Sequence, residues 1–191
     1  MAAAEPPATT PVTTPLPPAT PPSDGSDLVA ARREKLRKHR AELGIEPYGQ
    51  RVDGLMTLAA ARALFARAPF VADLGIEALA VADGRIDSEL RLAPRHYQHT
   101  GQVHAGVMVT LADHSMGIAA QTLAGDAVII TAELSIRLLR AARGERLFCE
   151  ARILKRGRNI SFTEADVYCD ADGQRTHVLR AAATMALTRP A

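Results

Sequence analysis

The chain has 191 residues, 47% of them hydrophobic, and it carries a formal net charge of +2 at pH 7 with a pI near 8.7. This length and apolar content suffice for one domain with its own core plus a tail. Aromatic residues make up only 4%, tryptophan is absent and the charge is mild, so a nucleic-acid-binding platform of stacked aromatics is disfavoured. Cys149 and Cys169 have no CxxC spacing, and the pattern therefore indicates neither a metal site nor a disulfide framework.

The N-terminal region differs in composition from the rest of the chain. Residues 1–25 are mostly Ala, Pro and Thr, which predicts a disordered tail. Residues 26–43 combine helix formers with six Lys and Arg residues and stop at Gly44, which predicts a short basic helix. A solvated helix is the favoured interpretation, and contact with acidic lipid or RNA is the alternative. We therefore assign residues 26–55 to a basic helix and linker and residues 56–191 to the main domain.

No targeting segment is apparent at the start of the sequence. The N-terminus lacks both a basic start and an apolar stretch of the secretory type. No apolar run approaches the roughly 18 residues of a membrane span. We expect a soluble, cytoplasmic protein.

The main domain opens with a helix and a hairpin. Residues 56–68 have helical spacing and end before Pro69. Two short runs on either side of Asp83 and Gly84 then alternate between apolar and polar residues, and this dipeptide is a strong hairpin signal. The strands are predicted at residues 76–82 and 85–92.

Four further strands are predicted in the second half of the chain, at residues 127–139, 147–153, 159–170 and 176–187. In the first of them Ile130, Leu134 and Leu138 fall on one face, and Thr131 falls on the other. We expect the four strands to pair as an antiparallel meander. The order of two strands, one long helix and four strands predicts an α+β fold with a curled antiparallel sheet of about six strands around that helix.

The segment between these two groups of strands, residues 98–123, is the candidate catalytic centre. Gly101 and Gly106 flank His104 and give the backbone room to approach a ligand, and a helix of mostly small residues follows. Asp113 lies inside that helix, where aspartate is locally unfavourable. It either lies on an exposed stripe with His114 and Gln121, or it serves a chemical purpose.

Three motifs of the chain resemble those of hot-dog-fold acyl-CoA thioesterases of the phenylacetate-degradation type. They are HAGVMVTLAD at residues 104–113, TAELSIRLLRAA from Thr131, and the turn at residues 155–158, and the resemblance covers about residues 64–187. It implies a hot-dog fold and hydrolysis of an acyl-CoA thioester to a carboxylate and coenzyme A, without a metal or redox cofactor.

The resemblance also implies roles for individual residues. Asp113 would be the general base toward water, or the nucleophile, and Thr131 would help to hold that water. The Ala105 N–H would donate to the oxyanion, while His104 would shape the turn and contact the acyl carbonyl. Gln98 stands where the family usually has Asn, and His99 is the alternative for that role.

The loop departs from the family pattern at one further position. The family commonly has His-Gly-Gly where this chain has His-Ala-Gly, so Ala105 would be strained if its position required a positive φ. Gly106 belongs to the same turn and is assigned to substrate binding.

Coenzyme A carries phosphates, and a basic turn would suit them. Lys155, Arg156, Gly157 and Arg158 form such a turn, with Arg158 as the best phosphate ligand, although a plain solvated hairpin is the alternative. By resemblance the protein would be a homodimer or homotetramer, with Asp113 facing Gln98 and Ala105 of the partner subunit.

Two other functions remain open at the level of sequence. One is a non-catalytic acyl-CoA-binding sensor or interaction module with a hot-dog fold. The other is a hot-dog dehydratase, for which the sequence has no hydratase-type motif.

Overall fold

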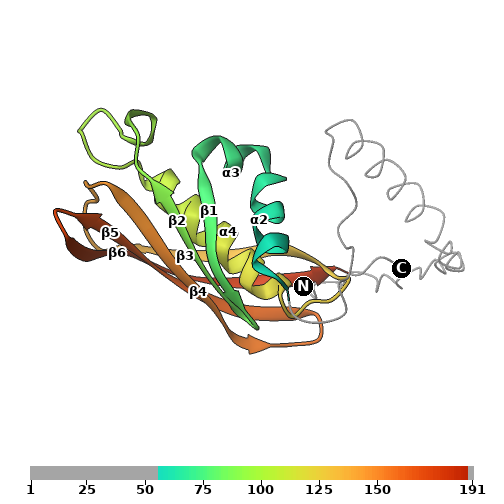
Figure 1. The fold of residues 1–191 in the computed structure, drawn as a ribbon. Coiled ribbons are helices and arrows are strands. Elements are labelled where there is room, and N and C mark those ends of the chain that lie inside the picture. The colour runs from blue at the N-terminus through green and yellow to red at the C-terminus, as the bar shows by residue number, and fades with distance from the viewer. Residues whose placement is uncertain (1–55, 189–191) are drawn as a thin grey trace, which may run out of the picture. The chain divides into compact units, whose positions relative to one another are not determined.

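The computed structural model describes residues 56–188 as one curved antiparallel sheet with a long helix, α4, lying across one of its faces (Figure 1). The predicted tail at 1–25 and the predicted basic helix at 26–43 lie outside the described residues. The elements in chain order are α2 (Leu58–Ala66), α3 (Pro69–Leu74), β1 (Ile76–Ala82), β2 (Arg85–Arg91), the short 3-10 helix η1 (Pro94–His96), α4 (Ala105–Gln121), β3 (Val128–Leu138), β4 (Arg146–Arg156), β5 (Ile160–Ala171) and β6 (Gln174–Thr188).

Local chemistry sets the first boundaries of the domain. The Thr57 hydroxyl accepts a hydrogen bond from the Ala60 N–H at 3.1 Å and so caps α2. Pro69 opens α3, and Gly75 closes it with a φ of 81°. The β1–β2 turn places Gly84 at a φ of 68°, which confirms the predicted hairpin.

The predicted meander of the last four strands is wrong for β3. The sheet order is β1-β2-β4-β5-β6-β3, so β3 pairs with β6, and β4 pairs with β2 and β5. Because α4 carries the chain across the sheet before β3 begins, β3 forms at the far edge. The connection then returns to β4 and is tied to the loop before α4 by the Val103 N–H, which donates to the Ala142 carbonyl at 2.9 Å. Residue alternation identifies a strand but not its neighbour.

The prediction that Ile130 shares one face of β3 with Leu134 and Leu138 is also wrong, because a β-bulge interrupts the strand. Thr131 pairs with Met185 and Glu133 pairs with Thr184, which leaves Ala132 as the extra residue. Alternation therefore changes phase at the bulge. Ile129 packs toward the core before it, Leu134 and Ile136 pack toward the core after it, and Ile130 is 52% exposed.

The core lies between α4 and the concave face of the sheet, and it is mostly aliphatic. Leu111 and Met116 of α4 are fully buried, as are Leu147 and Leu179 of the sheet. The buried Ser115 hydroxyl donates to the Leu111 carbonyl at 2.6 Å and lies 2.6 Å from the Ser88 hydroxyl of β2. This contact fixes the rotation of α4 about its axis, and with it the direction of the neighbouring Asp113.

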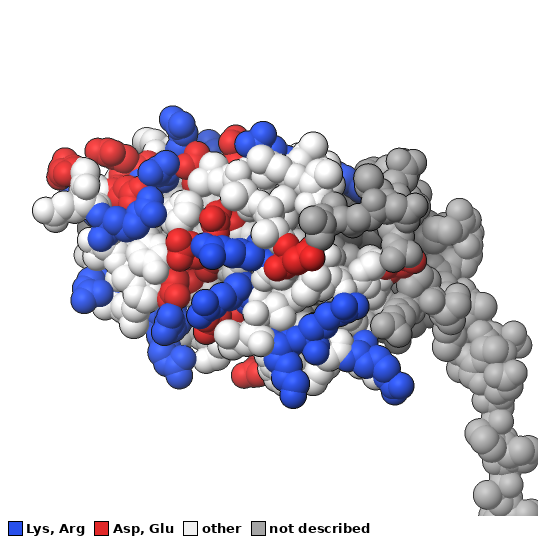
Figure 2. All heavy atoms as spheres, turned by 60° about the horizontal axis from the view of Figure 1, so that its bottom comes forward, with Lys and Arg blue, Asp and Glu red and all other residues white. Residues whose placement is uncertain are grey.

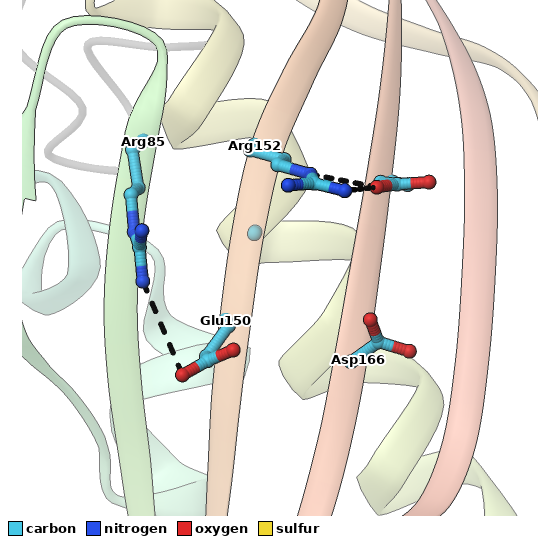
Figure 3. A pocket seen from close by; sticks show the side chains of 6 residues that line it. Arg85, Glu150, Arg152 and Asp166 are labelled. Atoms are coloured by element: carbon cyan, nitrogen blue, oxygen red, sulfur yellow. Dashed lines mark hydrogen bonds and ion pairs between the residues drawn. The ribbon is translucent and has the colours of Figure 1, made fainter.

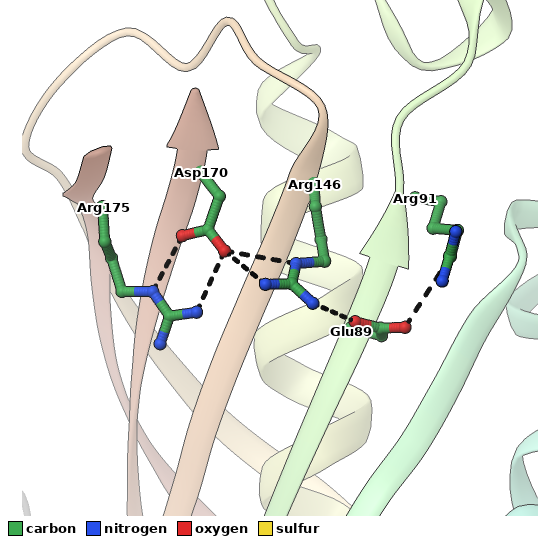
Figure 4. A network of polar contacts seen from close by, with 5 residues as sticks. All are labelled: Glu89, Arg91, Arg146, Asp170 and Arg175. Atoms are coloured by element: carbon green, nitrogen blue, oxygen red, sulfur yellow. Dashed lines mark hydrogen bonds and ion pairs between the residues drawn. The ribbon is translucent and has the colours of Figure 1, made fainter. Parts of the chain in front are cut away.

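The outer face of the sheet is charged. Figure 2, which turns this face toward the viewer, shows Lys and Arg side chains interspersed with Asp and Glu. A chain of ion pairs crosses four strands here, and Figure 4 shows its members, which are Arg91, Glu89, Arg146, Asp170 and Arg175. Among the described residues, no helix has both the length and the hydropathy needed to cross a membrane.

Candidate active site

The N-terminus of α4 presents a free backbone donor. His104 is the N-cap, and its ring Nδ1 accepts a hydrogen bond from the Gly106 N–H at 2.9 Å. The His104 carbonyl accepts from the Val107 N–H at 3.0 Å. Within residues 56–188 the Ala105 N–H has no hydrogen-bond partner. This donor lies at the positive end of the helix dipole and can hold an oxyanion.

Ala105 carries no backbone strain. It is the first residue of α4, and Asp172 is the one residue other than glycine with a positive φ in the described part of the chain. The strain considered for His-Ala-Gly in place of His-Gly-Gly therefore does not arise. Gly106 is the tighter position, because an added Cβ would lie 3.0 Å from the His104 Nδ1 atom.

Gln98 opens the turn that precedes this helix. Its N–H donates to the Gln102 carbonyl at 2.8 Å, and its carbonyl accepts from Gly101, which has a φ of 75°. The His104 N–H donates to the His96 carbonyl at 2.8 Å, which ties the two sides of the loop together. Gln98 is half-buried at the base of this loop, and His99 is exposed.

Asp113 and Thr131 are in direct contact, from two different elements. The Thr131 hydroxyl donates to Asp113 Oδ1 at 2.9 Å, and it also lies 3.6 Å from the Met185 sulfur. The bulge at Ala132 makes this possible, because it leaves Thr131 on the helix side of β3. Among the described residues Asp113 Oδ2 has no partner, so it is free to bind a water molecule.

A pocket of about 120 Å³ lies at this carboxylate. Five of its lining residues were not predicted to belong to a site, although Gly117 and Gln121 follow Asp113 at the helical spacing of one and two turns. That spacing is the signal that identifies them from sequence. The lining residues are Asp113, His114, Gly117, Ile118, Gln121, Ile129 and Thr131.

His114 is uncharged at neutral pH. Burial lowers the pKa of its imidazole to about 4, and its ring meets the ring of Phe65 edge-on, with 4.6 Å between the centroids. Asp113 is therefore the one formal charge in the lining of the pocket, which includes no Lys or Arg.

The free N–H of Ala105 and the carboxylate of Asp113 lie far apart within one chain. Ala105 and Asp113 are eight residues apart on a regular helix, which separates them by about 12 Å along its axis. One chain therefore brings Asp113 to Thr131, and Gln98 to the segment of His104 and Ala105, but it does not bring these two groups together.

The basic turn lies between β4 and β5. Lys155, Arg156 and Arg158 are exposed, and Gly157 closes the turn by donating to the Ile160 carbonyl at 2.8 Å. The register aligns Arg156 with Ser161, Met185 and Thr131 across β4, β5, β6 and β3. Three strand spacings place Arg156 about 14 Å from Thr131 in that row.

A second depression, of about 100 Å³, lies on the outer face of the sheet, with α4 behind the strands (Figure 3). Its carboxylates already have cationic partners. Arg152 Nε donates to Glu164 at 2.7 Å, and Asp166 accepts from Arg180 at 2.8 Å. Among residues 56–188, no group of three His, Cys, Asp or Glu side chains is arranged to hold a metal ion.

Comparison with known proteins gives consistent matches. Residues 100–176 match the family model of the Thioesterase superfamily. Human Acyl-coenzyme A thioesterase 13 is 26% identical over 100 residues, which are 52% of this chain and 71% of that protein. The crystal structure of a thioesterase family protein from Silicibacter pomeroyi is 29% identical with a TM-score of 0.67, over 70% of this chain and 100% of that one. Zebra fish Thioesterase Superfamily Member 2 is 27% identical with a TM-score of 0.62, over 69% of this chain and 98% of that one.

Proposed function

We propose that this chain is a member of the Thioesterase superfamily and acts as an acyl-CoA thioesterase, which hydrolyses a thioester to a carboxylate and free coenzyme A. The observation that carries the proposal is the Asp113 carboxylate, which lines a pocket and has one oxygen fixed by Thr131 and the other free. A cytoplasmic location stays a prediction from the sequence, and so does the phenylacetate-degradation subtype, against which the substrate panel described below tests a short aliphatic acyl group.

Asp113 acts as the general base. The Thr131 hydroxyl holds Oδ1 at 2.9 Å and so orients the carboxylate, while Oδ2 accepts a proton from water as that water attacks the thioester carbonyl. The products are the carboxylic acid and the thiol of coenzyme A, which takes up a proton as it leaves. Attack by the carboxylate itself, through an anhydride that water then cleaves, is the other route open to this residue.

The oxyanion donor comes from a second copy of the chain. The Ala105 N–H is free, but it lies about 12 Å along α4 from the Asp113 of its own chain. In a twofold dimer, Ala105 of the partner subunit faces Asp113, with Gln98 of the partner subunit beside it. The exposed edge of β3 supports such a dimer, because among the described strands β3 pairs with β6 alone and its residues 130–133 are exposed.

The turn at 155–158 holds the phosphates of coenzyme A. Lys155, Arg156 and Arg158 are exposed cations on the strand row that leads to Thr131, so the cofactor portion of the substrate extends from the pocket along the sheet.

Hydrolysis of a panel of acyl-CoA esters by the wild type and by Asp113→Asn tests the function. The wild type should turn over at least one ester many times, and Asp113→Asn should lose about 10³-fold or more in kcat because the base is removed. A matched control is Asp166→Asn, which changes a paired carboxylate on the outer face and should keep full activity. Equal rates for wild type and Asp113→Asn would remove Asp113 from the mechanism, and tight binding without turnover would favour an acyl-CoA sensor.

A further inference from the structure

Gly117 has no local reason to be a glycine. It lies in the interior of the 17-residue helix α4, where glycine is less favourable than alanine, and its φ is not positive. A Cβ added at this position would meet no atom of its surroundings within 4 Å, so close packing does not require glycine either. The space beside Gly117 is therefore open.

That open space belongs to the pocket at Asp113. Gly117 lies one helical turn after Asp113 on the same face of α4, and Gln121 lies one turn further on. All three line the pocket, together with Ile118 from the helix and Ile129 from β3. A side chain at position 117 would project into the pocket between the reacting end at Asp113 and the far end at Gln121.

We propose that Gly117 sets the length of the acyl group that this pocket accepts, and that the group is a short, uncharged aliphatic chain. The proposal rests on the proposed function, because it takes Asp113 as the end at which the thioester carbonyl lies. The acyl chain then runs from Asp113 past Gly117 toward Gln121.

The size and walls of the pocket support an aliphatic chain. The part of the pocket that one chain forms has a volume of about 120 Å³, which is below the roughly 150 Å³ of a protein cavity that accommodates benzene and so favours a short aliphatic group. Ile118 and Ile129 supply apolar walls, which match methylene groups.

The charges of the pocket exclude an acyl chain that ends in a carboxylate. Asp113 already brings one negative charge, and the lining includes no Lys or Arg to neutralise a second. His114 is neutral, and the Gln121 side-chain Nε2 donates to the Ala127 carbonyl at 2.9 Å and to the Gly125 carbonyl at 3.3 Å. A carboxylate at the far end of the acyl chain would therefore lie in the pocket without a cationic partner.

The test compares full-length wild type with Gly117→Ala and Gly117→Val on acetyl-, butyryl-, hexanoyl-, phenylacetyl- and succinyl-CoA. The wild type should prefer butyryl- or hexanoyl-CoA. Gly117→Ala should lower kcat/KM for hexanoyl-CoA about tenfold, since one methyl group in an apolar pocket is worth roughly that much, with less than about a twofold change for acetyl-CoA. Gly117→Val should extend the loss to butyryl-CoA.

A matched control adds the same bulk outside the pocket. Ala63 is exposed on α2, so Ala63→Val should leave the chain-length profile unchanged. The melting temperature of Gly117→Ala should be higher than that of the wild type, because alanine replaces glycine inside a helix. Sedimentation of this variant should show the same oligomeric state as the wild type. If Gly117→Ala prefers a shorter acyl group and is also more stable than the wild type, Gly117 acts on substrate specificity and is not required for folding.

Three outcomes would overturn the proposal. They are an equal fall of kcat/KM on every ester, a loss of the oligomer in the Gly117 variants, and a wild-type preference for phenylacetyl- or succinyl-CoA. If the wild type hydrolyses none of the esters, the proposed function fails, and calorimetric binding of acetyl- and hexanoyl-CoA then decides the role of Gly117. In that experiment Gly117→Ala should weaken the binding of hexanoyl-CoA but not of acetyl-CoA. An unchanged ratio of the two affinities would refute the proposed role of Gly117.

Discussion

The two depressions of this domain place carboxylates in opposite settings. On the outer face, Asp166 is held by Arg180 and His177, and Glu164 is held by Arg152. On the helix side, the one described partner of Asp113 is the neutral hydroxyl of Thr131. A carboxylate whose lone pairs are taken by guanidinium groups is a poor proton acceptor, so the outer carboxylates are tied into the sheet while Asp113 keeps one oxygen without a described partner.

Two carboxylates of the outer face have lowered pKa values. The Arg175 and Arg146 guanidiniums hold the pKa of Asp170 at about 2, and hydrogen bonds from Arg180 lower the pKa of Asp166. On the inner side, burial lowers the pKa of His114 to about 4 and so keeps this residue neutral beside Asp113. The outer face is thus built from compensated charges, and the inner pocket from one uncompensated charge with neutral neighbours.

The largest loss of activity that we predict here follows from removing the free backbone N–H at the N-terminus of α4. Ala105→Pro deletes the free N–H, and proline suits this position because Ala105 is the first helical residue and His104 before it is extended, with a φ of −63° and a ψ of 133°. Loss of one oxyanion donor should lower kcat by about 10² to 10³. Steady-state kinetics measure it, and circular dichroism confirms an intact fold.

Mixing two inactive variants then tests the shared site. In a heterodimer of Ala105→Pro and Asp113→Asn, one of the two sites keeps both Asp113 and the N–H of Ala105 from the partner subunit. Random exchange between equal amounts should therefore restore about a quarter of the wild-type activity. A mixture that stays inactive after subunit exchange would contradict a site built from two copies.

A smaller effect is expected at the hydroxyl that orients the base. Thr131→Val keeps the shape and the strand preference but removes the hydrogen bond to Asp113, and kcat should fall about tenfold because the carboxylate loses its fixed orientation. Thr131→Ser retains the hydroxyl and is the matched control. Activity equal to wild type in Thr131→Val would mean that the 2.9 Å contact does not contribute to the reaction.

The smallest effect concerns the outer face, and it should appear in stability rather than in rate. Asp170→Asn leaves Arg146 and Arg175 without their shared carboxylate, and it should lower the free energy of unfolding at pH 7 by about 1 kcal/mol, with kcat unchanged. Urea denaturation and acyl-CoA hydrolysis measure the two quantities.

The pH dependence of that loss follows from the pKa of Asp170. Its pKa is lowered from 3.8 to about 2 in the folded protein, so its contribution is present above pH 3.8 and disappears as the pH falls through about 2. The stability difference between wild type and Asp170→Asn should therefore shrink between pH 4 and pH 2. A difference that stays constant over this range would show that the ion pairs do not stabilise the fold.

Particular residues show how far the sequence leads. Asp83 and Gly84 predict the first hairpin because a two-residue turn is a local property, and the structure confirms it. The helical spacing of apolar residues over residues 107–123 predicts the long helix, which the structure has at Ala105–Gln121, and the unfavourable placement of Asp113 within it predicts a site. The position of β3 in the sheet is not predictable in this way, because pairing with β6 depends on where α4 delivers the chain.

The sequence by itself determined the α+β class, the strands, the central helix and the residue types of the site, since each depends on local propensity and periodicity. Only the tertiary structure decided which way Thr131 points, because the bulge at Ala132 is a register shift against β6 and leaves no mark in the alternation of the strand. The pocket between α4 and β3, and the open space beside Gly117, likewise exist only after the helix and the strand have packed together.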